Sequence, residues 1–263
     1  MGPNAKPRVA FYDFTCCEGC QLVFLSQEDA LLDLLSHVEI VNFREVTSRR
    51  EEDCDIAFIE GSITTDEEVE RLKRIREHAR TLVAFGACAT TGGVNKLKNR
   101  RPMDENLRMV CGPMERYPNT IPTLAVPEVV RCEYLLHGCP IDGGELRRLW
   151  LALVDGREFR QPNVPVCYDC RLRENVCLYH KQIVCLGPIT RSGCGAICPT
   201  WGVRCDGCRG LIDQPNLNAE HSLLRQYGLT VERMIDQYVV FQGSVLSGEA
   251  APGKVSFAQR GAD

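Results

Sequence analysis

Eight cysteines lie within the 42 residues from 167 to 208, and this density constrains the fold more than any other feature of the chain. Eight further cysteines are spread between residues 16 and 139. The N-terminal stretch "MGPNAKPRVAFYDFTCC" has no export signal and no twin-arginine pair, so we expect the protein to be cytoplasmic. Because thiols stay reduced there, metal coordination explains sixteen cysteines better than disulfides or unrelated buried thiols.

The dense cysteines divide by spacing into two sets of four. The first set is Cys167, Cys170, Cys177 and Cys185, and the second is Cys194, Cys198, Cys205 and Cys208. Zinc ribbons usually pair two C-x2-C knuckles around one ion, whereas each set here contains only one. This pattern favours iron–sulfur clusters over zinc. The Cys198-Pro199 ending is typical of ferredoxin runs in which the last cysteine ligates the neighbouring cluster, so an interleaved division stays open.

The first part of the chain alternates β-rich runs with helical patterns. Strands are predicted at 8–14, 38–43, 54–63, 81–88 and in "EYLLHGCP" (133–140), and helices at 21–37, 64–79 and 142–156. Thr65 and Glu68 form a capping-box pattern at the start of the second helix. Leu146, Leu149 and Trp150 lie on one face of the third. Alternation of this kind predicts an α/β fold with a doubly wound, mostly parallel sheet.

Four of the upstream cysteines follow predicted strands. Cys17 and Cys20 come after the first strand, Cys88 lies in the glycine-rich "FGACATTGG", and Cys139 lies in "LHGCPID". The carboxyl ends of parallel strands meet at one edge of a sheet, where ligands bind. Glycine also lets the backbone approach an inorganic body closely. We therefore expect these four thiols to converge on one point.

The chain is predicted to have two domains and a tail. The sheet domain spans 1–156, and the cysteine-rich domain spans 157–241 after a Pro/Gln/Asn linker. The dense cysteine stretch is poor in apolar residues, so we expect metal sites rather than a core of its own to organise it. Short helices are predicted at 219–228 and 230–241. Residues 242–263 read as a flexible or partner-wrapping arm.

Charge and hydropathy exclude two classes of partner. The formal net charge is −4 and no basic stripe is present, which argues against nucleic-acid binding. Apolar runs such as "TLVAFGACA" are far shorter than the roughly 20 residues of a membrane helix, so we expect no transmembrane segment.

Several motifs in a fixed order point to one protein family. They are "CCEGCQL" at 16–22, "IEGSI" at 59–63, "GACATTGG" at 86–93, "GCP" at 138–140 and "CLGPITRSGCGAICPTWGVRCDGC" at 185–208. With these motifs nearly the whole chain resembles the small subunit of NiFe hydrogenases. It is most similar to the cytoplasmic, NAD(P)-linked kind typified by the sulfhydrogenase delta subunit.

The resemblance implies a flavodoxin-like N-terminal domain and three 4Fe–4S clusters. It assigns a proximal cluster to Cys17, Cys20, Cys88 and Cys139, a medial cluster to Cys194, Cys198, Cys205 and Cys208, and a distal cluster to Cys167, Cys170, Cys177 and Cys185. Periplasmic members have a distal histidine ligand where Cys167 stands here, and a proline where Cys198 can be a fourth medial ligand. Both changes add negative charge, which we expect to lower the two reduction potentials.

The resemblance also implies partners and an electron-transfer function. The NiFe centre would lie in a large subunit, and electrons would pass through this chain to a flavin-containing diaphorase subunit and an iron–sulfur subunit that react with NAD(P). One alternative is a complex-I-like or heterodisulfide-reductase-linked hydrogenase subunit with another acceptor. A zinc-stabilised interaction module is an alternative from a different class. The choice of NAD or NADP, the physiological direction, oxygen tolerance and sulfur reduction all stay open.

The functions of five further residues are not settled by these motifs. Cys16 forms a tandem with Cys17 and could compete with Cys20 as a ligand, as adjacent cysteines do in the related complex I subunit. Glu18 could relay a proton, face a partner subunit or be a solvated carboxylate. Cys54 is most simply a core residue, and Cys111 and Cys132 have no predicted partner.

Overall fold

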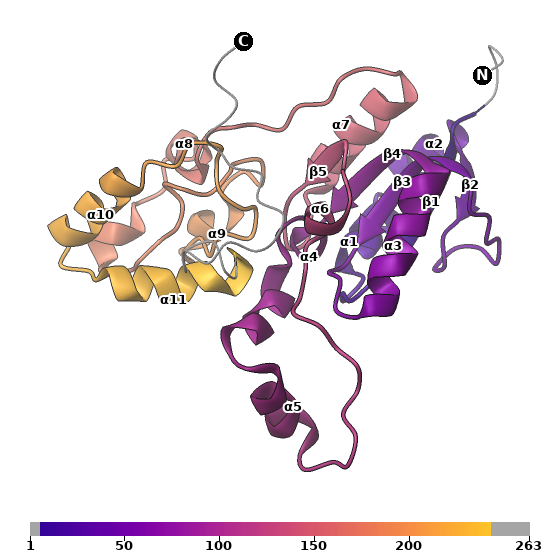
Figure 1. The fold of residues 1–263 in the computed structure, drawn as a ribbon. Coiled ribbons are helices and arrows are strands. Elements are labelled where there is room, and N and C mark those ends of the chain that lie inside the picture. Colours follow the sequence, from indigo (N-terminus) through magenta and orange to yellow (C-terminus); the bar gives the residue numbers. More distant parts are fainter. Residues whose placement is uncertain (1–5, 243–263) are drawn as a thin grey trace, which may run out of the picture.

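The chain forms a five-stranded parallel sheet followed by a smaller, loop-rich region (Figure 1). A computed structural model describes residues 6–242. The strands are β1 (Arg8–Asp13), β2 (Glu39–Asn42), β3 (Cys54–Glu60), β4 (Ala79–Phe85) and β5 (Tyr134–Leu136), and their order in the sheet is β2-β1-β3-β4-β5. All four pairings are parallel, which confirms the predicted α/β fold and its flavodoxin-like strand order.

Helices cover both faces of the sheet. On one face lie α1 (Gly19–Leu25), α2 (Asp29–Ser36) and α7 (Gly143–Val154), whose apolar residues join a core with Phe11 and Phe58. On the other face lie α3 (Asp66–His78) and α6 (Val126–Val129). Two separate cores therefore hold the strands, one on each side.

The face of α7 predicted from its spacing is the one that packs on the sheet. Leu146, Leu149 and Trp150 are all buried. The Trp150 ring lies 5.5 Å from the ring of Phe58, and its indole N–H donates to the carbonyl of Leu34 at 3.1 Å. The indole therefore joins α7, the sheet and α2 while its one polar group stays satisfied.

The first predicted helix, 21–37, is wrong as a single element, because two helices with a break between them occupy this stretch. Ser26 and Gln27 both donate their side chains to the carbonyl of Val23, which competes with the helical hydrogen bonds. Glu28 then adopts a left-handed φ of 51°. By contrast, the predicted capping box at α3 is confirmed, with Thr65 Oγ1 accepting from Glu68 N–H at 3.2 Å.

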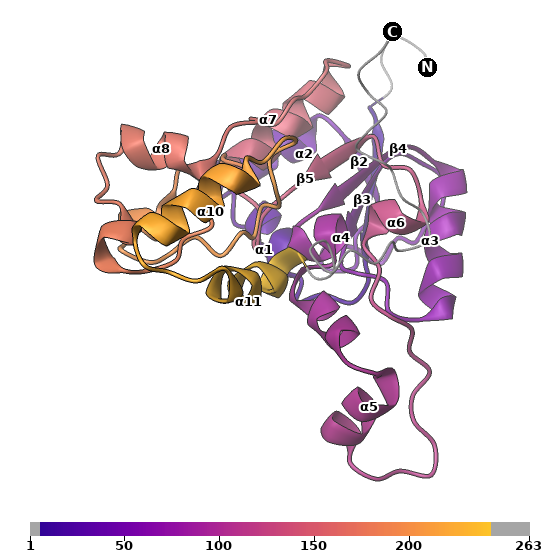
Figure 2. The same cartoon turned by 60° about the vertical axis from the view of Figure 1, so that its left-hand side comes forward.

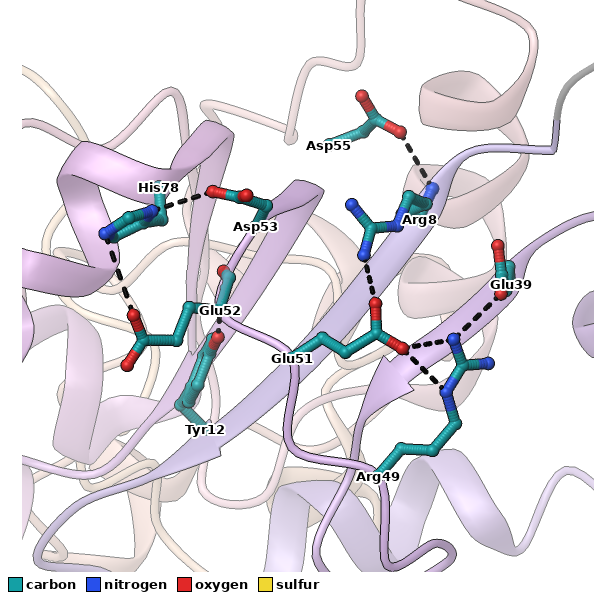
Figure 3. Close-up of polar contacts among 9 residues, drawn as sticks. All are labelled: Arg8, Tyr12, Glu39, Arg49, Glu51, Glu52, Asp53, Asp55 and His78. Carbon is teal, nitrogen blue, oxygen red and sulfur yellow. Dashed lines mark hydrogen bonds and ion pairs between the residues drawn. The ribbon is translucent and has the colours of Figure 1, made fainter.

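The connection from β2 to β3 is held at the amino ends of the strands by exposed charged groups (Figure 3). Glu51 pairs with Arg8 and Arg49, and Arg49 also reaches Glu39 at 2.9 Å. Nearby, His78 Nδ1 lies 2.7 Å from the Asp53 carboxylate. Water and salt screen such pairs, so each contributes little to stability by itself.

A long excursion separates β4 from β5. It contains α4 (Ala87–Thr91), the 3-10 helix η1 (Gly93–Arg100) and α5 (Met103–Cys111). In Figures 1 and 2, α5 projects away from the rest of the fold, and none of its residues is buried. The sequence analysis does not predict these elements.

The cysteine-rich region has a hydrophobic core, so the prediction that it lacks one is wrong. Its short helices are α8 (Val166–Leu172), η2 (Leu178–Lys181) and α9 (Ile197–Thr200), followed by α10 (Leu217–Gln226) and α11 (Val231–Gln242). The core includes Val166, Leu186, Leu224, Met234 and Tyr238. Most of this core comes from the cysteine-dense stretch itself, and α10 and α11 add Leu224, Met234 and Tyr238.

Helix α11 also returns to the sheet domain. The Gln237 side chain donates to the carbonyl of Cys205 at 2.7 Å, and Thr91 Oγ1 donates to the carbonyl of Phe241 at 2.9 Å. One helix thus contacts both cysteine-bearing regions. The predicted arm at 242–263 lies outside the described residues except for its first residue.

Within residues 6–242, no helix is long and apolar enough to cross a membrane.

Candidate metal centres

The loop after β1 carries Cys17 and the start of α1 carries Cys20, and a buried carboxylate holds this segment. Glu60, the last residue of β3, is 2% exposed and accepts the backbone N–H groups of Cys20 and Gln21 at 3.0 Å each. Both N–H groups belong to the first turn of α1, where they have no helical partner, and this end of a helix favours negative charge. Glu60 therefore fixes the position of Cys20. It lies in the "IEGSI" motif, but its role was not predicted.

The loops that carry Cys88 and Cys139 are joined to each other. The N–H of Gly86 donates to the carbonyl of Leu136 at 2.8 Å, and that of Ala87 to the carbonyl of Gly138 at 2.6 Å. The ends of β4 and β5 are therefore tied together, and Cys88 and Cys139 are presented at the same edge of the sheet as Cys17 and Cys20.

The four upstream thiols lie close enough to affect one another. Burial, followed by Cys139 and Cys17, raises the pKa of Cys88 to about 12. Burial and Cys17 raise the pKa of Cys139. Burial raises the pKa of Cys20, with Glu60 next and Cys139 as a smaller cause. The raised pKa values of Cys20, Cys88 and Cys139 mean that binding of a metal cluster to these three thiols would release protons.

Glycines leave the space next to these sulfurs open. A Cβ added at Gly86, where φ is 88°, would lie 2.5 Å from the Cys20 Sγ. A Cβ added at Gly93 would lie 3.2 Å from the Cys88 Sγ. A cradle of this kind, with four thiols around it, fits an iron–sulfur cluster at this edge of the sheet.

A cavity of about 310 Å³ lies where the cysteine-rich region meets the sheet domain. Its lining includes Cys194, Cys198, Cys205 and Cys208, together with Cys139. Four thiolates on one zinc ion would close around it at about 2.3 Å per bond, so an open cavity between them fits a larger inorganic body better. Among residues 6–242, no three His, Cys, Asp or Glu side chains are arranged to hold a single metal ion.

A second cavity of about 130 Å³ is lined by the other C-terminal thiols, Cys167, Cys170, Cys177 and Cys185. A Cβ added at Gly187 would lie 3.2 Å from the Cys167 Sγ and 3.5 Å from the Cys185 Sγ. Burial raises the pKa of Cys167 to about 12, followed by the effects of Cys185, Cys170 and Cys177. Each set of four thus surrounds a cavity of its own, which favours the sequential division over the interleaved one.

The three sets follow one another in space. Cys139 of the upstream set lines the same cavity as the four cysteines of the second set. The backbone N–H of Cys205 donates to the Cys185 Sγ at 3.3 Å. The second set therefore shares a cavity with one upstream thiol and is hydrogen-bonded to the third set.

The remaining cysteines differ in their surroundings. Cys16 is half-buried, and burial, followed by Glu60, raises its pKa to about 12, with Cys88 as a smaller cause. Cys54 is buried in the core under α3, as predicted, and Cys132 packs against the same core. Cys111 is exposed on α5.

Two further residues near the upstream site have unusual environments. Glu18 precedes α1 with a left-handed φ of 60°, and its side chain makes no capping hydrogen bond. His137 Nδ1 is buried, and within the described chain it has no hydrogen-bond partner. Burial, followed by Arg191 and Arg209, lowers the pKa of His137 to about 3, so its ring is neutral.

Sequence comparisons place the chain among hydrogenase subunits. The family model described as NADH ubiquinone oxidoreductase, 20 Kd subunit, matches residues 17–153. Sulfhydrogenase 2 subunit delta of Pyrococcus furiosus is 35% identical over 222 residues, which cover 83% of this chain and 92% of that protein. A subunit of the F420-non-reducing hydrogenase vhu of Methanococcus voltae is 31% identical, over 80% of this chain and 84% of that protein.

A solved structure agrees with the sequence relatives. It is that of an NAD+-reducing NiFe hydrogenase in the H2-reduced state, and it is similar with a TM-score of 0.55 and 32% identity. The match covers 60% of this chain and 96% of that one. The chain therefore belongs to the NADH ubiquinone oxidoreductase 20 Kd subunit family, and within it to the small subunits of NiFe-type hydrogenases.

Proposed function

We propose that this small subunit conducts electrons through three 4Fe–4S clusters between a NiFe large subunit and an NAD(P)-reactive partner. The observation that carries the proposal is the series of thiol sets: Cys139 shares a cavity with the second set, and the Cys205 N–H donates to the Cys185 sulfur of the third. Iron–sulfur clusters, when bound, accept and release single electrons at potentials that the protein sets. The chemistry on H2 itself belongs to the large subunit.

The proposed ligands follow the three sets. The proximal cluster is assigned to Cys17, Cys20, Cys88 and Cys139, the medial cluster to Cys194, Cys198, Cys205 and Cys208, and the distal cluster to Cys167, Cys170, Cys177 and Cys185. Proximal ligands belong to a sheet domain at 1–156, and the other eight to a domain at 157–241.

The residues around the thiols have distinct functions in this proposal. Glu60 holds the turn that presents Cys20 through two backbone hydrogen bonds. The N–H of Cys205 aimed at the Cys185 sulfur favours the thiolate form, as hydrogen bonds to ligating sulfur do. Thiolates at Cys167 and Cys198 add negative charge to the distal and medial sites, which lowers their reduction potentials.

The proposed partners are a NiFe large subunit, a flavin-containing diaphorase subunit and an iron–sulfur subunit, all in the cytoplasm. The similarity to an NAD+-reducing hydrogenase structure supports a nicotinamide acceptor. Glu18, in the loop between two proximal cysteines, is proposed to face the large subunit or to relay a proton. The similarity to an F420-non-reducing hydrogenase favours a second candidate, a subunit of a hydrogenase that delivers electrons to a different acceptor.

Purification of the native complex tests the proposal. We expect a brown complex with broad absorbance near 400 nm, co-purifying large and flavin-containing subunits, and at least about twelve iron and twelve sulfide for each copy of this chain, with iron of the other subunits in addition. A colourless chain that contains zinc would contradict the electron-transfer function. A complex without a flavin subunit would instead favour the second candidate.

A further inference from the structure

A fully buried ion pair joins the two cysteine-bearing regions. Arg209 is 1% exposed and Glu145 is 0% exposed by side chain, and the guanidinium Nη2 lies 2.9 Å from Oε1 and 2.8 Å from Oε2 of the carboxylate. Arg209 also donates through Nη1 to the carbonyl of His137 at 2.7 Å and through Nε to the carbonyl of Ser192 at 2.8 Å. All three nitrogens of one guanidinium are therefore engaged.

These contacts reach the segments that carry the proximal and medial thiols. Arg209 directly follows Cys208, and Ser192 comes two residues before Cys194. On the other side, His137 comes two residues before Cys139. Glu145 lies in the first turn of α7, where its own N–H is held by the Asp142 side chain at 2.8 Å. The backbone that carries the Glu145 carboxylate is thus anchored in the sheet domain.

The surrounding backbone leaves space for the guanidinium. A Cβ added at Gly193, where φ is 118°, would lie 2.4 Å from Arg209 Nη2 and 3.0 Å from the Glu145 Oε1. Only glycine fits at this position without displacing the ion pair. Gly193 is also the residue directly before Cys194, so the same turn serves the pair and a thiol.

Stability alone does not explain such a pair. Desolvation of two charges offsets much of their attraction, and apolar residues of similar volume often stabilise a protein as well or better. An arginine fork, however, fixes direction, because its donors are rigid and planar. The Arg209–Glu145 pair therefore contributes little to the free energy of folding. Its main effect is to hold the turn with Cys208 in one orientation relative to the end of β5.

We propose that Arg209 is a positioning residue that fixes the spacing between the proximal and medial thiol sets. The inference rests on the proposed electron-transfer function. Its guanidinium holds the Cys208 turn against the loop that carries Cys139, and so fixes how these two cysteines lie around the cavity that both line. Electron transfer between two centres falls steeply with their separation, so a rigid spacing keeps this step fast.

Variants of the intact complex test the proposal. The double variant Arg209→Met/Glu145→Leu removes both charges and keeps an apolar filling of similar size, so we expect it to fold with full iron content. We expect weaker magnetic coupling between neighbouring reduced centres in pulsed electron paramagnetic resonance, and a several-fold loss of H2-dependent dye reduction. Arg209→Lys keeps the charge but cannot reach all three partners, so intermediate coupling is expected. The matched control is Arg204→Lys, an exposed pair with Asp206 in the same loop, which should leave both readouts unchanged.

Unchanged coupling and unchanged dye reduction in the fully loaded double variant would overturn the positioning function. Equal loss of iron in the double variant and in Arg209→Lys would also overturn it, since the pair would then be needed only for folding. A separate result would contradict the electron-transfer function itself: a wild-type complex in which this chain contains no iron and no sulfide.

Discussion

The two regions of this molecule present thiols in different ways. In the sheet domain, three strand ends that are far apart in sequence deliver Cys17, Cys20, Cys88 and Cys139 to one edge, and two large cores hold the strands. In the C-terminal region, eight thiols lie on short helices and turns around one smaller core. The first site depends on the sheet, whereas the second and third depend on local turns. The sheet domain should therefore stay folded without metal more readily than the region that follows it.

The largest effect is expected from removal of one proximal ligand. Cys88→Ser should abolish H2-dependent dye reduction and lower the iron content by about one third, because a thiolate of the first site is lost. Circular dichroism should stay close to that of the wild type, since the sheet does not depend on the metal. The matched control is Cys111→Ser on the projecting α5, where activity and iron content should not change. Full activity with full iron in Cys88→Ser would show that the proximal assignment is wrong.

The next largest effect concerns the sheet core. Trp150→Ala should lower the free energy of unfolding by about 3–5 kcal/mol, because it leaves a cavity among buried aromatic rings. Denaturant unfolding measured by circular dichroism checks this value. Trp201, the other tryptophan, is 80% exposed, so Trp201→Ala should change the free energy by only about 0.5 kcal/mol or less. Equal effects at the two positions would contradict the burial of Trp150 in the sheet core.

A moderate effect is expected at the distal site. Cys167→His replaces an anionic ligand with a neutral one, so the distal cluster should be retained and its reduction potential should rise. A redox titration followed by electron paramagnetic resonance measures the change. The proximal signal serves as an internal reference, because Cys167 lies in the other region. An identical titration curve for the variant and the wild type would contradict the charge argument.

The smallest effect concerns the exposed charges at the amino ends of the strands (Figure 3). A hydrogen bond with Asp53 raises the pKa of His78, so this pair stabilises the folded state below the unfolded pKa of about 6.5. The contribution is lost as the pH rises through the raised pKa of the folded state. The difference in urea midpoint between wild type and Asp53→Asn should be present near pH 6 and absent by about pH 9. A difference that grew toward high pH would contradict this sign.

Local patterns predicted the features that depend on local sequence. The strands, the Thr65–Glu68 capping box and the Trp150 face all follow from short-range periodicity and capping chemistry. The convergence of Cys17, Cys20, Cys88 and Cys139 could be predicted because parallel strands share one carboxyl edge. The grouping of the C-terminal thiols around two cavities follows the sequence spacing but needed the structure to favour it over an interleaved one.

Features that depend on distant contacts were missed. In the sequence, Glu60 is an ordinary carboxylate at the end of a strand. Its hydrogen bond with the backbone N–H of Cys20 is visible only in the structure. The pairing of Arg209 with Glu145 joins residues 64 positions apart, and nothing in either local sequence indicates it. The third core was missed for a different reason: the apolar residues of the cysteine-dense stretch, such as Leu178, Leu186 and Ile189, follow no regular period, and only the fold brings them together with Leu224 and Tyr238. The break after Leu25 arose from side chains that compete with the helix, which periodicity does not register.

The path of α11 has a consequence for biosynthesis. Thr91 and Phe241 lie 150 positions apart, so their hydrogen bond can form only after nearly the whole described chain has left the ribosome. Phe241 also lines the cavity next to Cys198 and Cys208. During translation, that cavity therefore lacks one of its walls until both cysteine regions have been made. The thiols of that cavity therefore stay more open until α11 has packed against the sheet domain.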